Sequence, residues 1–202
     1  IQPRLQVIRV SVSSGSTTPV PSPAGPRPGL ELEARQELGA FAELLEGFAV
    51  GANATFIDSE VTFPQAQLDE FAAANLPYFG ATRDATNAPE SLYNLYATYD
   101  IADTQTQFAL FYTVQGDTLV AGDSTSQFNY IPAIYQKSFG TLNASISQRL
   151  TKNVTLRLAA SNLTNPSIDQ VYRSPLIDGD TTFTSFTRGV EYSLGISANF
   201  SF

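Results

Sequence analysis

The 202-residue sequence contains no Met, Cys, His or Trp, and its 19 acidic and 11 basic residues give a net charge of −8 at pH 7. Without His or Cys, the chain lacks an imidazole base, a thiolate nucleophile and nitrogen or sulfur ligands for a transition metal, so we expect neither enzymatic activity nor a cofactor. The negative charge would repel nucleic-acid phosphates, which excludes nucleic acid as a partner. Because there is no initiator Met, we expect a processed or partial product.

Unbroken apolar runs do not exceed about five residues, whereas a membrane-spanning helix needs roughly 20. Any membrane would therefore be crossed by strands. Alternation of apolar and polar residues with a period of two predicts seven strands. Residues 4–12 are a weaker eighth candidate, because their apolar residues fit either face. In chain order, the apolar sets of the seven strands are Leu30, Leu32, Ala34 and Leu38; Phe48, Val50, Ala52, Ala54 and Phe56; Tyr93, Leu95, Ala97 and Tyr99; Phe108, Leu110, Tyr112 and Val114; Leu142, Ala144 and Ile146; Val154, Leu156, Leu158 and Ala160; and Val190, Tyr192, Leu194, Ile196, Ala198, Phe200 and Phe202.

The last strand alternates without interruption from Val190 to Phe202. At about 3.3 Å per residue and a tilt near 40°, a strand of this length crosses a hydrocarbon layer of roughly 25 Å. The predicted connections alternate between short ones, near residues 39–46, 102–104 and 150–152, and long ones, near residues 12–28, 61–88, 119–134 and 165–186. Short turns on one side and long loops on the other are typical of outer-membrane barrels.

The sequence therefore predicts an all-β protein, an antiparallel transmembrane β-barrel with short turns in the periplasm and long loops outside the cell. A secreted β-sandwich also alternates apolar and polar residues. Its strands are typically about half as long as the last one here, and its loops have no reason to be sorted by side.

Polar residues on the opposite face of these strands are candidates for the barrel lumen. Four charges, Glu31, Glu33, Arg35 and Glu37, alternate along one strand and would form a solvated wall, a contact with a domain inside the barrel or, less favourably, a ligand track. Further candidates for the lumen are Asn53, Arg157 and Glu191.

Aromatic residues in the long loops are candidates for stacking on a ligand or for packing within the loops. These are Tyr78, Phe79, Phe128, Tyr130 and Tyr172. Asp178 and Asp180 bracket Gly179 and are weak candidates for Ca²⁺, although two acids in a loop more often form a polar turn. No other metal site is expected.

Several motifs, taken in order, resemble a known family. They are Gly29-Leu30-Glu31-Leu32-Glu33-Ala34, Asn87-Ala88-Pro89 leading into Leu92-Tyr93-Asn94-Leu95, Asn162-Leu163-Thr164-Asn165, and the closing strand Arg188 to Phe202. Over residues 29–202 the chain resembles the C-terminal barrel of TonB-dependent outer-membrane receptors. Two details depart from the pattern: Arg188 precedes Gly189, and Pro166 follows the Asn-Leu-Thr-Asn motif directly.

The resemblance implies that residues 1–202 are roughly the last eight strands of a 22-strand barrel, with the plug domain and the TonB box outside this chain. It implies import of an iron–siderophore, cobalamin or glycan. The implied partners are outer-membrane lipid, the rest of the barrel and its plug, the TonB complex through other segments, and the barrel-assembly machinery, for which Tyr192, Phe200 and Phe202 form the signal. The alternative is a closed eight-strand barrel acting as a small pore, adhesin or structural protein. Pairing between its first and last strands would distinguish it.

Overall fold

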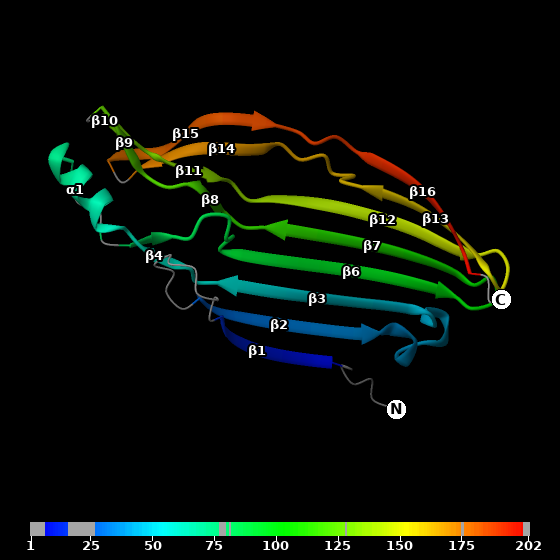
Figure 1. The fold of residues 1–202 in the computed structure, drawn as a ribbon. Helices are drawn as coiled ribbons and strands as arrows, with labels where there is room; N and C mark the ends of the chain where they lie inside the picture. Colours follow the sequence, from blue (N-terminus) through cyan, green and yellow to red (C-terminus); the bar gives the residue numbers. More distant parts are fainter. Residues whose placement is uncertain are drawn as a thin grey trace.

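The chain folds into one long, curved antiparallel sheet that continues at one end into smaller sheets (Figure 1). The computed structural model describes residues 7–15, 27–76, 80, 82–127, 129–174 and 176–199. The main sheet has eight strands in the order β1-β2-β3-β6-β7-β12-β13-β16. Their bounds are β1 Val7–Gly15, β2 Arg27–Glu37, β3 Phe48–Ile57, β6 Ser91–Ile101, β7 Thr106–Gln115, β12 Phe139–Arg149, β13 Val154–Ser161 and β16 Glu191–Ala198.

Every neighbouring pair in the main sheet is antiparallel and follows the chain without a register shift. The all-β prediction is confirmed, with changes at three strand ends. The first strand is described from Val7 and continues past the predicted residue 12, whereas residues 4–6 of the prediction lie outside the described residues. Leu38, predicted as the last apolar residue of a strand, instead begins a short helix. The closing strand ends at Ala198, and Phe200, Ser201 and Phe202 lie outside the described residues.

Apart from Phe111, the large exposed apolar side chains of the main sheet lie on one side, which we call the apolar face. The residue pairings place all of the following on it: Val10, Leu30, Leu32, Val50, Phe56, Tyr93, Leu95, Phe108, Leu110, Tyr112, Ile146, Leu158, Tyr192, Leu194 and Ile196. A water-soluble protein would bury such a surface, since monomers rarely expose large contiguous apolar patches. The pairings also place polar residues on this face, including Gln36 and Gln148. Gln36 is 7% exposed, and its side-chain amide donates to the Glu37 carbonyl oxygen over 2.8 Å.

The three described connections at one end of the main sheet are short, as predicted. The longest joins β2 to β3 and contains two single-turn 3-10 helices, η1 Leu38–Ala40 and η2 Glu43–Leu45. Gly47 ends it with φ of 84°, a conformation that suits glycine because it has no side chain. The other two connections join β6 to β7 and β12 to β13.

The long loops contain more regular structure than the sequence suggested. Strands β8 Thr118–Ala121, β11 Ala133–Gln136, β14 Ile168–Ser174 and β15 Ile177–Phe186 form a four-stranded sheet in the order β15-β14-β11-β8. This order repeats that of β16, β13, β12 and β7, so two hairpins of the main sheet extend beyond it (Figure 1). Two further hairpins, β4 Glu60–Thr62 with β5 Thr82–Asp84 and β9 Ser124–Ser126 with β10 Asn129–Ile131, and a helix, α1 Gln65–Ala73, complete the loop region.

Buried side chains concentrate in the loop region. Leu119 and Ile168 are the largest that are fully enclosed, and Phe63, Ala85, Ala133 and Val171 are also buried. Among the described residues, Ala49 and Gln36 are the buried side chains of the main sheet. A single sheet layer has no second layer to pack against, so the main sheet needs a surrounding that accepts its apolar face. The loops, by contrast, form a small core of their own.

The two outer edges of the main sheet do not meet. Strands β1 and β16 stand at opposite ends of the strand order, and the described residues contain no pairing between them. The barrel is therefore not closed by these strands. In the part of the chain that the structure describes, no helix has the length and apolar character needed to cross a membrane.

Candidate functional site

The side of the main sheet opposite the apolar face, which we call the polar face, carries a continuous polar row. Arg9 of β1 pairs with Glu33 of β2, and the row continues through Asn53, Asn94 and Thr113 to Thr141 of β12. The Asn94 amide donates to Asn53 Oδ1, and the Thr113 hydroxyl donates to Asn94 Oδ1, each over 2.7 Å. These bonds link the side chains of three neighbouring strands, β3, β6 and β7.

All the lumen candidates in the main sheet lie on this polar face. Glu31 accepts a 3.3 Å hydrogen bond from Ser11, and Arg35 lies 4.0 Å from Glu37. The register places the following candidates on one face, with the first five on β2 and β3 and the last two on β13 and β16: Glu31, Glu33, Arg35, Glu37, Asn53, Arg157 and Glu191. The sequence prediction that they share one face therefore agrees with the strand pairing, and their contact with a domain in the lumen stays a prediction.

An aromatic pair on the polar face was not predicted. Tyr96 is paired with Gly51, and a Cβ at Gly51 would stand 2.2 Å from the Tyr96 ring. The ring of Phe111 lies 6.1 Å from that of Tyr96, between centroids. A glycine in the middle of a strand often marks such a close approach. Gly51 was therefore the feature of the sequence that could have indicated a large side chain packed against this strand. The pair offers an apolar contact within an otherwise polar surface.

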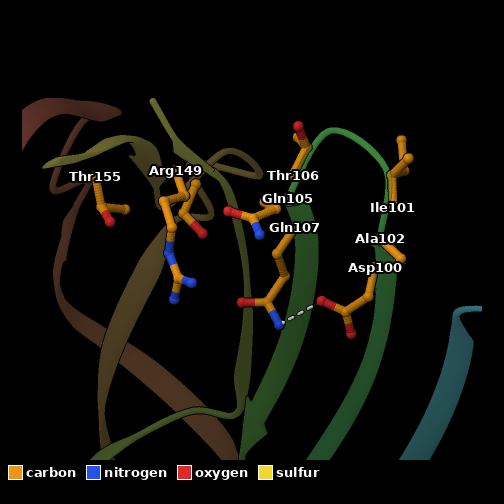
Figure 2. A pocket seen from close by; sticks show the side chains of 9 residues that line it. Asp100, Ile101, Ala102, Gln105, Thr106, Gln107, Arg149 and Thr155 are labelled. Carbon is orange, nitrogen blue, oxygen red and sulfur yellow. Dashed lines mark hydrogen bonds between the residues drawn. The ribbon is translucent and has the colours of Figure 1, made fainter. Parts of the chain in front are cut away.

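A shallow hollow of about 410 Å³ lies where the polar face reaches the short turns (Figure 2). Asp100 of β6 accepts a 2.9 Å hydrogen bond from the Gln107 amide of β7, and Arg149 of β12 extends toward the same space. A second hollow, of about 480 Å³, shares Asp100 and is lined by the turn between β2 and β3. The hollows are lined by side chains of both charges.

At the other end of the molecule, Arg173 joins two long loops through an ion-pair cluster. Its Nε and Nη2 donate to the two carboxylate oxygens of Asp180 over 2.9 and 3.0 Å, and Nη2 also donates to Asp117 over 2.8 Å. The guanidinium carbon lies 4.6 Å from the centroid of the Tyr135 ring, and the Tyr135 hydroxyl donates to Asp84 over 3.0 Å. Since Asp84 belongs to a third loop, this group, the Arg173 cluster, links all three described long loops.

The charges of the Arg173 cluster shift one another's pKa values. Hydrogen bonds from Arg173 lower the pKa of Asp180, and the bond to Asp180 in turn raises the pKa of Arg173. Burial, followed by the charge of Asp84, raises the pKa of Tyr135. Burial, followed by repulsion from Asp117, raises the pKa of Glu90. Arg173 thus stays charged while it holds the carboxylates around it.

Tyr130 extends the contacts between loops toward α1. Its hydroxyl donates to Asp123 Oδ1 and accepts from Ser174 over 3.2 Å, while the Gln67 side chain donates to the Asp123 carbonyl oxygen over 2.8 Å. Tyr130 was a ligand candidate, and here its hydroxyl bonds within the loops. Burial and then the bond to Asp123 raise its pKa to about 12.

This contact predicts a loss of loop stability at alkaline pH. The ordinary pKa of tyrosine is about 10, and the raised folded value of about 12 means that the folded state holds its proton more tightly. The contribution of Tyr130 is therefore intact below about pH 10 and is lost as the pH rises through about 12. Subtracting the tyrosinate absorbance titration of Tyr130→Phe from that of the native protein isolates the ionisation of Tyr130. The midpoint of this difference should lie near pH 12. A difference centred near pH 10 would count against the contact.

The remaining sequence candidates have separate positions. Tyr172 packs its ring edge-on against Phe183 with centroids 5.1 Å apart. Tyr192 is exposed on the apolar face at the β16 edge. The candidates Tyr78, Phe79, Phe128, Phe200 and Phe202 lie outside the described residues.

The Ca²⁺ candidates receive no structural support. Asp180 is engaged by Arg173 and lies 3.8 Å from Lys137. Within the residues that the structure describes, no group of three or more His, Cys, Asp or Glu side chains could hold a metal ion.

A broad antiparallel sheet with one apolar face, one polar face and loops sorted by length defines the wall of a β-barrel. The family model described as TonB dependent receptor-like, beta-barrel matches residues 9–163, from β1 to the end of β13. The chain therefore belongs to this family, whose members are outer-membrane transporters rather than enzymes. No curated protein and no solved structure matches the chain significantly.

Proposed function

We propose that this chain is the C-terminal part of the barrel of a TonB-dependent receptor that actively imports a scarce nutrient of the iron–siderophore, cobalamin or glycan class. The observation that carries the proposal is the main sheet itself. It presents one apolar and one polar face, and its β1 and β16 edges lie apart. Unpaired backbone groups in lipid cost several kcal/mol each, so these edges are expected to pair with other strands of a larger barrel.

In this proposal, the polar face surrounds a plug domain and the apolar face contacts outer-membrane lipid. The long loops lie outside the cell and the short turns in the periplasm. The plug and the TonB box belong to segments other than residues 1–202, and the TonB complex acts through them. The barrel-assembly machinery recognises the closing segment with Tyr192, Phe200 and Phe202. Candidates for ligand contact are Tyr78, Phe79, Phe128, Tyr130 and Tyr172. Candidates for contact with the plug are Glu31, Glu33, Arg35, Glu37, Asn53, Arg157 and Glu191.

The alternative of a closed eight-strand barrel requires β1 to pair with β16. In the described parts of these strands, Val7–Gly15 and Glu191–Ala198, no such pairing exists. This arrangement favours the receptor over a self-contained pore, adhesin or structural barrel.

The orientation can be tested by labelling cysteines in the complete receptor on intact cells. Leu176 and Asp103 are both exposed, Leu176 at the tip between β14 and β15 and Asp103 in the short turn between β6 and β7. A membrane-impermeant thiol reagent should label Leu176→Cys, and should label Asp103→Cys only after the outer membrane is permeabilised. The opposite pattern would reverse the orientation, and equal labelling of both on intact cells would contradict the membrane location.

Uptake is tested by deleting the gene and supplying ferric siderophores, cobalamin or glycans in turn as the limiting nutrient. Loss of growth or uptake for one class, restored by the intact gene and only in cells with a working TonB complex, is the expected result. Unchanged uptake of all three classes would contradict the import proposal.

A further inference from the structure

The turn between β2 and β3 exposes two large apolar side chains at the end of the barrel wall. Phe41 is 56% exposed and Leu44 is 90% exposed. Neither is explained by packing within the turn or by the polar face. Exposed apolar side chains that continue a larger apolar surface indicate an interaction site.

The turn is held in a defined orientation. The Phe41 amide donates to the Leu38 carbonyl oxygen and the Leu45 amide to that of Ala42, each over 2.9 Å. At the base, the Asp100 amide donates to the Gly47 carbonyl oxygen over 2.9 Å, and a Cβ at Gly47 would stand 2.3 Å from the Asp100 carbonyl oxygen. This close approach fixes the turn against β6, so Phe41 and Leu44 project from an anchored element.

The turn has a polar side and an apolar side. Glu43 and Glu46, its only charged residues, line the 480 Å³ hollow at the polar face together with Ala40. Phe41 and Leu44 do not line that hollow. Both acids therefore border the hollow, whereas Phe41 and Leu44 lie outside its lining.

The turn leads directly into the apolar face of the main sheet. Phe48, the first residue of β3, lies on that face and stacks on Tyr99 with ring centroids 3.9 Å apart. The Tyr99 ring is in turn 6.4 Å from that of Phe108. Aromatic rows at the end of a barrel's apolar band are typical of the lipid–water interface, and the turn begins immediately beyond this row.

We propose that Phe41 and Leu44 insert into the lipid–water interface of the leaflet nearest the short turns, so that the turn anchors this part of the wall at a fixed depth. The inference rests on the proposed membrane location and adds a contact beyond the strands. A lipid surface fits better than a protein partner because the turn begins immediately beyond the aromatic row. Phe41 and Leu44 also lie outside the hollow bordered by Glu43 and Glu46, which anionic lipid headgroups would repel.

The test uses the complete receptor in vesicles of ordinary or brominated phosphatidylcholine, in which bromine quenches nearby indole fluorescence. Trp is introduced singly by Phe41→Trp or Leu44→Trp, and the emission of the parent protein is subtracted; residues 1–202 contribute no Trp of their own. Glu43→Trp is the matched control in the same turn, and Leu110→Trp on the apolar face reports insertion of the wall itself.

We expect brominated lipid to remove most of the added emission at positions 41, 44 and 110 and little of it at position 43. Quenching at position 110 with none at 41 and 44 would overturn the anchor alone, and would favour a periplasmic protein partner for the turn. Equal quenching at 41, 43 and 44 would also overturn it, because the turn would then have no separate apolar side. Absence of quenching at position 110 would overturn the proposed membrane location together with the anchor.

Discussion

Leu110→Arg is expected to prevent most of the protein from accumulating in the outer membrane. Leu110 is exposed on the apolar face of β7, where it pairs with Ala97 of β6 and Ala144 of β12. An arginine on the lipid side of a barrel near the bilayer midplane costs about 2–4 kcal/mol, and assembly must carry this cost. The measurement is the amount of folded protein in isolated outer membranes. Folded barrel is recognised in gel electrophoresis because an unheated sample migrates differently from a heated one.

Ala109→Arg provides the matched control. Ala109 is the adjacent residue on the same strand and pairs with Thr98 and Ser145 on the polar face. The same charge placed there should leave membrane levels close to those of the native protein, because the polar face does not contact lipid. If the two variants were equally depleted or equally abundant, the assignment of the faces to lipid and lumen would be wrong.

Arg173→Ala should loosen all three described long loops together. The change removes three charge-assisted hydrogen bonds and the stacking on Tyr135, and it leaves Asp117 and Asp180 close to each other without their cation. Charge-assisted hydrogen bonds contribute about 1.5–3 kcal/mol when sheltered. Because Arg173 is 35% exposed, solvent screening reduces the expected loss to about 1–2 kcal/mol of local stability. Hydrogen exchange of the amides in β11 and β14 should accelerate accordingly.

Lys137→Ala is the control for Arg173→Ala, because it also removes one positive charge from the loops but leaves the hydrogen bonds of Arg173 in place. Lys137 approaches Asp180 only to 3.8 Å, and its side chain is 50% exposed, so the pair should contribute little. Exchange in the loops should therefore hardly change in this variant, and exchange in β3 and β6 of the main sheet should change in neither. Faster exchange in Lys137→Ala than in Arg173→Ala would contradict the central position of Arg173.

The main sheet could be predicted because its physics is local. Each strand has one face toward an apolar surrounding and one toward a polar interior. Apolar and polar residues therefore alternate along segments such as residues 142–147, where the sequence alone reveals the strand. Consecutive hairpins then determine the strand order without long-range information. The shared face of Glu33 and Asn53 followed from the same rule, although their pairing depended on the length of the intervening turn.

The loop sheet could not be predicted because its signals are hidden or nonlocal. Ile168 and Val171 are both buried, although an odd spacing normally puts residues of one strand on opposite faces. The register shift at this point leaves Phe183 of β15 as an extra residue opposite β14, which no local pattern indicates. Strand β15 is rich in threonine and aspartate and has no apolar alternation. The pairing of Arg173 with Asp117 joins positions 56 residues apart. Only the assembled hairpins bring these charges together.

The extension of two wall hairpins into the loop sheet constrains how these loops can diversify. At about 3.3 Å per residue, an added pair of residues in each arm raises the rim while every side chain keeps its side of the sheet. A single added residue in one arm instead turns all residues beyond it to the other side, which would remove Val171 or Ile168 from the core unless a second bulge compensates. Viable length variants among relatives should therefore differ by even numbers of residues in the arms, whereas the tips near residue 176 are free to vary in any step.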